Sequence, residues 1–186
     1  MLKHELRKRY IEKRRTLDFS STETYSHSIA NRLLQIPIWD FFYFHLFLSI
    51  MEKKEVDTSP IITILHAKDK NIVIPKMGNE NQLKNYLLTD STLIKKNKWL
   101  VPEPQDGIEV PEHKIDVVFV PLLSFDVTGH RVGYGKGYYD IFLQKCRPKT
   151  IKIGLSFFGP EKKIVDINAG DVKLDYCITP NKTYSF

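Results

Sequence analysis

The segment at residues 115–121, IDVVFVP, constrains the fold most, because its apolar side chains would point to both faces of a strand. Such strands are typical of the centre of a parallel sheet, where helices cover both sides. Strand-like residues 43–50 and 71–75 flank a predicted helix that Pro60 opens and that reaches Ala67. A helix between two apolar strands is the pattern of a right-handed βαβ unit. We therefore predict an α/β fold with a mostly parallel central sheet flanked by helices.

The rest of the chain supplies further helices and strands but no boundary between domains. Ser20 and Glu23 form a capping-box pattern, which predicts a helix from there to about Gln35. The chain contains no internal repeat, low-complexity segment or linker, so residues 1–186 are expected to form a single domain. The other strand candidates are residues 83–88, 92–94, 150–155 and 176–179.

The composition excludes several classes of protein. With 42% hydrophobic and 12% aromatic residues among 186, the chain is neither disordered nor collagen-like. Two cysteines, Cys146 and Cys177, cannot form a disulfide framework or a Cys-x-x-Cys zinc motif, which predicts reduced thiols. The charged start is unlike a signal peptide, and the longest apolar stretch, residues 36–51, is interrupted by Pro37 and Asp40. We expect a cytoplasmic protein that does not bind a membrane.

Positive charge is concentrated at the N-terminus. The first fifteen residues carry seven Lys or Arg side chains and two Glu, whereas the whole chain has a formal net charge of +6. This basic excess would suit a nucleic-acid-binding module. The remainder of the chain is close to neutral, however, so a solvated helix face or a site for a small anionic ligand would explain the same charges.

A helix is predicted over this basic segment. Leu6, Tyr10 and Leu17 would form one apolar stripe along it and dock on the protein. Two of the cations beside the stripe, Lys3 and Arg7, stand one turn apart and could reach one polyphosphate together. The cations at the edge of the stripe are Lys3, Arg7 and Arg14.

A glycine-rich segment, residues 125–140, follows the central strand and reads FDVTGHRVGYGKGYYD. Its glycines at positions 133, 135 and 137 permit positive φ and a close approach of the backbone to a ligand. A helix starting near Tyr138 would direct free N–H groups at an anion, while Lys136 adds a cation. Asp140 in the first turn offers an oxygen ligand for Mg²⁺. A phosphate cradle and a purely structural turn both fit these residues.

Other motifs narrow the chemistry. The loop lacks the Gly-Lys-Ser/Thr ending of a Walker motif, and Tyr138 replaces the third glycine of the dinucleotide fingerprint. The chain has no Gly-x-Ser-x-Gly elbow, and its histidines show no metal-ligand spacing. Lone aspartates usually cap helices or form turns, but one near the C-terminus would meet Asp140 at a metal if the last strand lay beside the loop. The candidates are Asp166, Asp171 and Asp175.

The pattern Phe-Asp-x-x-Gly-x-Arg-x-Gly-x-Gly-x-Gly-Tyr-Tyr-Asp in residues 125–140 resembles the 5-formyltetrahydrofolate cyclo-ligase family, also called methenyltetrahydrofolate synthetases. The resemblance covers essentially the whole chain and implies a single α/β domain with a mostly parallel sheet. Two departures stand out: Tyr134 replaces an arginine of some members, and the spacing from Ser49 to Glu55 is longer than in some members. The supporting segments are Lys3-x-x-x-Arg7, residues 47–49, 55–58 and 74–76, Trp99-x-x-Pro102-x-Pro104, Asp171 and Asp175.

The resemblance implies an enzyme that uses ATP and Mg²⁺ to convert 5-formyltetrahydrofolate into 5,10-methenyltetrahydrofolate, ADP and phosphate. The reaction would pass through a phosphorylated formyl group, an iminium phosphate. Phosphoryl transfer asks mainly for positioning and charge neutralisation, so the absence of a nucleophilic triad is expected. The implied partners are small molecules, not nucleic acid, and the protein would be a monomer. A different small-molecule enzyme on a similar scaffold, acting on an acyl-CoA or a phosphosugar, remains an alternative.

The same resemblance implies a role for individual residues. Lys136 and Arg131 would be catalytic cations, and Asp140 and Asp171 would hold Mg²⁺. The expected ATP-binding residues are Lys3, Arg7, Arg131, Val132, Gly133, Tyr134, Gly135, Lys136, Gly137, Tyr138 and Tyr139. The expected folate-binding residues are Leu48, Glu55, Trp99, Tyr134, Gly135, Lys136, Gly137 and Tyr138.

Overall fold

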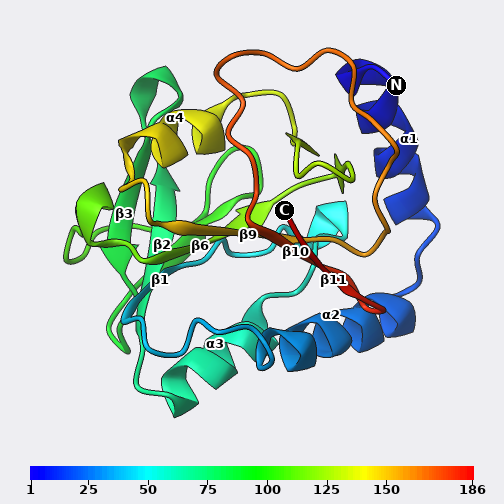
Figure 1. The fold of residues 1–186 in the computed structure, drawn as a ribbon. Helices are drawn as coiled ribbons and strands as arrows, with labels where there is room; N and C mark the ends of the chain where they lie inside the picture. The colour runs from blue at the N-terminus through cyan, green and yellow to red at the C-terminus, as the bar shows by residue number, and fades with distance from the viewer.

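A seven-stranded sheet forms the centre of the computed structural model, which describes residues 1–186 (Figure 1). The five strands from β10 to β2 are parallel, and the edge strands β3 and β11 each pair antiparallel with their neighbour. The predicted mostly parallel central sheet is therefore confirmed. In spatial order the strands are β11 (Thr183–Ser185), β10 (Tyr176–Ile178), β9 (Ile151–Leu155), β6 (Val117–Pro121), β1 (Tyr43–His45), β2 (Asn71–Met77) and β3 (Leu83–Leu87).

Strand β6 lies in the middle of the sheet, and this position accounts for its apolar sequence. It pairs in parallel with β1 on one side, Phe44 opposite Val117, and with β9 on the other, Phe119 opposite Ile153. Val117 and Phe119 belong to a core cluster with residues of α2 and α3, while Val118 and Val120 belong to a second cluster with α4. Alternate side chains therefore enter two separate cores, as the period of a strand requires.

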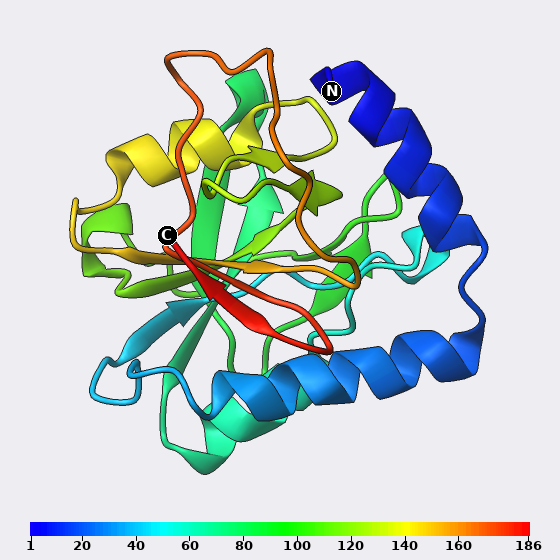
Figure 2. The ribbon, with the colours of Figure 1, turned by 45° about the vertical axis from the view of Figure 1, so that its right-hand side comes forward.

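Helices cover both faces of the sheet. In Figures 1 and 2, α2 (Phe19–Leu33) and α3 (Ser59–Ala67) lie on one face and α4 (Tyr138–Lys145) lies on the other. The predicted βαβ unit is present, because β1 and β2 are parallel neighbours with α3 between them in sequence. None of the helices has both the length and the apolar character required to traverse a bilayer.

Helix α1 (Lys3–Arg15) lies at the side of the sheet, alongside the chain that leads to β10 (Figure 2). Leu6 and Tyr10 pack on a short hairpin, β7 (Ser124–Phe125) and β8 (Arg131–Val132), and its surroundings. The prediction that Leu17 shares this stripe is wrong, because the helix ends at Arg15 and Leu17 packs against the α2 and α3 core instead.

Three further boundaries differ from the prediction. Asp18, and not Ser20, caps α2: its Oδ1 accepts a hydrogen bond from Ser21 N at 2.6 Å, and the helix ends at Leu33. Strand β1 is only three residues long, so residues 46–50 leave the sheet. The segment after residue 92 forms a ribbon of β4 (Ile94–Lys96) and β5 (Pro102–Pro104). The remaining elements are the short 3₁₀ helices η1 (Met51–Lys53), η2 (Asn79–Asn81) and η3 (Glu112–Lys114).

Candidate active site

A cavity of about 450 Å³ opens at the carboxyl ends of the central strands. Pro121 at the end of β6, Met77 at the end of β2 and Leu48 just after β1 are among its lining residues. In open α/β sheets, ligands bind at the carboxyl ends of the strands, where successive connections run to opposite sides. Here β2 and β6 lie on opposite sides of β1, which places the site cavity at such a point.

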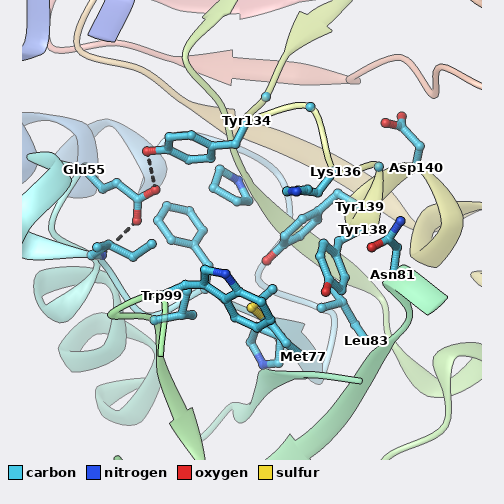
Figure 3. A pocket seen from close by; sticks show the side chains of 18 of the residues that line it. Glu55, Met77, Asn81, Leu83, Trp99, Tyr134, Lys136, Tyr138, Tyr139 and Asp140 are labelled. Carbon is cyan, nitrogen blue, oxygen red and sulfur yellow. Dashed lines mark hydrogen bonds between the residues drawn. The ribbon is translucent and has the colours of Figure 1, made fainter. Parts of the chain in front are cut away.

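Every residue to which the family resemblance gives a role lines this one cavity, and Figure 3 labels several of them, among them Glu55, Lys136 and Asp140. They come from α1, the chain after β1, the β4–β5 ribbon, the glycine loop at residues 131–139, the first turn of α4, and the segment before β10. The structure thus brings together residues that are far apart in sequence. They are Lys3, Arg7, Leu48, Glu55, Trp99, Arg131, Val132, Gly133, Tyr134, Gly135, Lys136, Gly137, Tyr138, Tyr139, Asp140 and Asp171.

The glycine loop has the predicted left-handed backbone at two of its three glycines. Gly135 has φ +91° and Gly137, the N-cap residue of α4, has φ +75°, conformations that side-chain-bearing residues rarely adopt. Gly133 has no positive φ, and a Cβ there would meet nothing within 4 Å, so this position does not use the conformational freedom that glycine permits. At Gly135 a Cβ would lie 3.2 Å from the guanidinium carbon of Arg7.

Residues of helix α1 bind both the glycine loop and the segment before β10. Arg7 Nε donates a hydrogen bond to the carbonyl oxygen of Gly133 at 3.0 Å. The backbone N–H of Lys3 donates to Asp166 Oδ1 at 2.8 Å, while its ammonium forms an ion pair with Asp171. The cations that the sequence placed on one side of α1 therefore point into the protein, and they bridge the glycine loop and the C-terminal segment.

Asp140 and Asp171 form the acidic side of the cavity. Asp140 Oδ1 accepts hydrogen bonds from Arg131 Nη2 at 2.8 Å and from Val172 N at 3.0 Å. Asp171 Oδ2 accepts from Asn168 N at 2.8 Å and pairs with Lys3. Partial burial disfavours the charged form of Asp171, but these hydrogen bonds and the Lys3 charge outweigh it and lower its pKa.

The donor set fits a cation that is held jointly with a ligand. The structure contains no group of three or more His, Cys, Asp or Glu side chains arranged to hold a metal. In each of Asp140 and Asp171, however, only one carboxylate oxygen is used in hydrogen bonds within the protein. Mg²⁺ characteristically takes one or two carboxylates and completes its shell with phosphate oxygens and water. Asp175, a third candidate, instead pairs with Lys152 and does not line the cavity.

The opposite side of the cavity carries a fixed carboxylate. Glu55 is buried; its Oε2 accepts a hydrogen bond from Ile50 N and its Oε1 from the Tyr134 hydroxyl, both at 2.8 Å. Figure 3 shows this pair on one side and Asp140 on the other, with the Tyr138 and Tyr139 rings between them. The cavity thus carries separate groups that could contact two parts of a ligand.

Lys136 and Tyr139 are among the polar residues at the cavity whose side chains have no hydrogen-bond or ion-pair partner within the protein. Lys136 is exposed and takes part in no hydrogen bond or ion pair, although Figure 3 shows its ammonium directed toward the cavity. The Tyr139 hydroxyl is buried and also has no hydrogen-bond partner. Burial is the main cause that raises the pKa of Tyr139, with the Glu55 charge adding to it, so this phenol stays protonated.

Several lining residues were not predicted from the sequence, among them Lys53, Met77, Asn81 and Leu83. They come from η1, the end of β2, η2 and the start of β3. The strand signal at residues 83–88 located β3, but no motif indicated that β3 would fold back beside β2 and place these side chains at the cavity.

The fold and the cavity together define an α/β domain with a candidate active site under a glycine-rich loop, at the carboxyl ends of parallel strands. A profile of the 5-formyltetrahydrofolate cyclo-ligase family matches residues 1–180, and the chain belongs to that family. The resemblance identified from the glycine loop is therefore confirmed.

Individual relatives agree with this assignment. A Schizosaccharomyces pombe protein named probable 5-formyltetrahydrofolate cyclo-ligase is 29% identical over 176 residues, 86% of each chain. The mouse 5-formyltetrahydrofolate cyclo-ligase is 32% identical over 143 residues, 70% of this chain and 69% of its own. The NMR structure of 5,10-methenyltetrahydrofolate synthetase from Aquifex aeolicus superposes with a TM-score of 0.82 at 28% identity, covering 100% of this chain and 93% of that one. These similarities support cyclo-ligase activity.

Proposed function

We propose that this chain uses ATP to convert 5-formyltetrahydrofolate into 5,10-methenyltetrahydrofolate, ADP and phosphate. Membership of the cyclo-ligase family supports the reaction. The observation that carries the assignment of both substrates to one site is the shared cavity, in which the glycine loop and the Glu55 carboxylate face the same space of about 450 Å³. A nucleotide bound at the loop and a folate bound near Glu55 would place the terminal phosphate against the folate.

The proposed chemistry activates the formyl oxygen, which is a poor leaving group. Transfer of the γ-phosphoryl group of ATP to this oxygen gives an iminium phosphate and releases ADP. Nitrogen N10 of the folate then attacks the formyl carbon, the bond from that carbon to the phosphorylated oxygen breaks, and phosphate leaves as N10 loses its proton. Such a transfer needs positioning and neutralisation of charge more than a protein nucleophile.

The residues of the phosphate side suit that task. The N-terminus of α4 directs backbone N–H groups and the positive end of its dipole toward the loop. Lys136 is assigned to the transferring phosphoryl group, because it has no competing partner in the protein. Lys3 and Arg7 add positive charge from α1. Arg131 is assigned as the second catalytic cation, and it also holds Asp140 through an ion pair.

Asp140 and Asp171 would hold Mg²⁺ together with the nucleotide. The ion would neutralise phosphate oxygens when bound. On the folate side, we assign binding to Glu55, Leu48 and Trp99 with residues 134–138. We further propose that the protein is a cytoplasmic monomer that acts on small molecules and does not bind nucleic acid.

The direct test is an assay with 5-formyltetrahydrofolate, Mg²⁺ and ATP. The methenyl bridge conjugates the ring system, so the expected result is a rise in near-ultraviolet absorbance that requires ATP. Acyl-CoA and sugar phosphates serve as alternative ligands in a thermal-shift comparison, because a bound ligand raises the apparent stability of the folded protein. A shift with those compounds and no absorbance change with folate would contradict the proposal.

A further inference from the structure

Arg14 is a buried cation that lies outside the site cavity. Only 5% of the residue is exposed, and it is not among the residues that line the cavity. None of the ion pairs in the structure includes it. Burying a charge without a directly bound counter-charge is unfavourable unless hydrogen bonds compensate. The position of Arg14 in the last turn of α1 therefore calls for an explanation beyond packing.

The contacts of Arg14 point toward the site. Its Nη1 donates a hydrogen bond to the Tyr134 hydroxyl at 2.9 Å, and its Nη2 donates to the carbonyl oxygen of Leu122, next to the end of β6. The guanidinium therefore joins α1, the chain after β6 and the glycine loop. Because the bond to Leu122 holds the guanidinium in place, the direction from which the Tyr134 hydroxyl accepts a hydrogen bond is fixed.

Tyr134 passes this constraint to Glu55. Since its oxygen accepts from Arg14, its single proton is free to go to Glu55 Oε1, 2.8 Å away. Burial and the nearby Glu55 charge raise the pKa of Tyr134, so the phenol keeps that proton. With Ile50 N bound to Oε2, each carboxylate oxygen has one fixed partner and retains acceptor capacity for a ligand. Figure 3 shows the hydrogen bond from Tyr134 to Glu55 at the edge of the cavity.

We propose that Arg14 is a positioning residue for the folate substrate, which acts through Tyr134 to hold the Glu55 carboxylate for recognition of the pterin ring. This inference rests on the proposed function. A pterin presents neighbouring N–H donors on one edge, which match a carboxylate whose two oxygens are fixed in direction. Arg14 does not line the cavity, so its removal should weaken folate binding through Tyr134 and Glu55 and spare the nucleotide.

Arg14→Met tests this in a binding experiment. Titration calorimetry would measure the Kd for 5-formyltetrahydrofolate without nucleotide and, separately, the Kd for ATP with Mg²⁺. We expect folate binding to weaken at least about tenfold, as for a lost hydrogen bond to a charged group, and ATP binding to change less than about threefold. Arg15→Met is the matched control on the same helix, because Arg15 is exposed and pairs only with Glu12; both affinities should stay at the wild-type values.

A double-mutant cycle tests whether Arg14 affects folate binding through Tyr134. If Arg14 acts through Tyr134, folate binding in the double variant Arg14→Met/Tyr134→Phe should match that of Tyr134→Phe within about twofold. The proposal would be overturned if the losses of folate affinity in the two single variants multiplied in the double variant. It would also be overturned if folate affinity were unchanged in Arg14→Met, or if that variant lost affinity for folate and ATP equally. If Arg14→Met does not fold, Arg14→Lys is judged by the same criteria. Failure of the wild-type protein to bind 5-formyltetrahydrofolate would instead refute the proposed function.

Discussion

The Arg7 side chain of α1 donates a hydrogen bond from Nε to the carbonyl oxygen of Gly133 in the glycine loop, at a distance of 3.0 Å. The same guanidinium lies against Gly135, where a Cβ would approach its central carbon to 3.2 Å. The N-terminal helix and the glycine loop are therefore packed so closely that a side chain at Gly135 would fit only if the Arg7 side chain shifted by a few tenths of an ångström.

Gly135→Ala is expected to damage the loop. The substitution puts a Cβ at φ +91° and against Arg7, so we expect a loss of about 1–3 kcal/mol in the free energy of unfolding. The KM for ATP should also rise. Gly133→Ala is the stability control, because its φ is not positive and a Cβ there meets nothing within 4 Å. Equal unfolding free energies for the two variants in urea titrations would contradict the account of the loop.

Lys136→Ala should separate activity from stability. Lys136 makes no hydrogen bond or ion pair, so its removal should leave the melting temperature unchanged. If its ammonium stabilises the transferring phosphoryl group, kcat should fall at least about a hundredfold. Lys149→Ala removes another exposed lysine, away from the cavity, and should retain wild-type kcat. A Lys136→Ala enzyme with near wild-type turnover would remove this residue from the mechanism.

Asp171→Asn should change the magnesium requirement. Loss of one carboxylate charge is expected to raise at least about tenfold the Mg²⁺ concentration that gives half-maximal activity. Asp175→Asn is the comparison, because Asp175 pairs with Lys152 and does not reach the cavity. The two variants are compared by titrating Mg²⁺ at saturating ATP and folate. An unchanged Mg²⁺ dependence in Asp171→Asn would argue against a metal at this place.

His45 makes the stability depend on pH. It is fully buried, neither ring nitrogen has a hydrogen-bond partner, and burial lowers its pKa to about 3. Between that value and the ordinary pKa near 6.5, the unfolded chain binds a proton that the folded protein excludes. This group therefore lowers stability as the pH falls below about 6.5, by about 1.4 kcal/mol per pH unit.

His45→Leu should remove that dependence. Between pH 7 and pH 5, we expect the unfolding free energy of the wild type to fall by about 2 kcal/mol more than that of the variant. Urea denaturation at the two pH values measures this difference. If wild type and variant lose the same stability over this range, His45 does not titrate on unfolding as described.

Much of the fold follows from local patterns. Strand β6 was predicted as central because both of its faces are apolar, and Val117 and Val118 indeed enter opposite cores. Helix α3 was located by the proline in its first turn. By contrast, Asp18 and Ser20 are equally good caps in isolation, and only the hydrogen bond to Ser21 N distinguishes them. Strand β11 was not predicted, because its short sequence becomes a strand only by pairing with β10.

In the site, too, some features follow from local sequence and others depend on contacts between distant residues. The glycine loop carries its chemistry in contiguous residues, so its members could be identified before the fold was known. The links between distant residues could not, because they depend on how the chain folds back. Arg14, Tyr134 and Glu55 are joined across sequence separations of 120 and 79 residues. Asn81 and Leu83 reach the cavity only because β3 pairs with the end of β2.

The central claim is that the protein transfers a phosphoryl group from ATP to the formyl oxygen of the folate. Following that oxygen through the reaction tests this claim most directly. The measurement is mass spectrometry of the inorganic phosphate formed from 5-formyltetrahydrofolate labelled with ¹⁸O in its formyl group. The account predicts one ¹⁸O atom in each phosphate released. Unlabelled phosphate, with the label recovered in water, would contradict it.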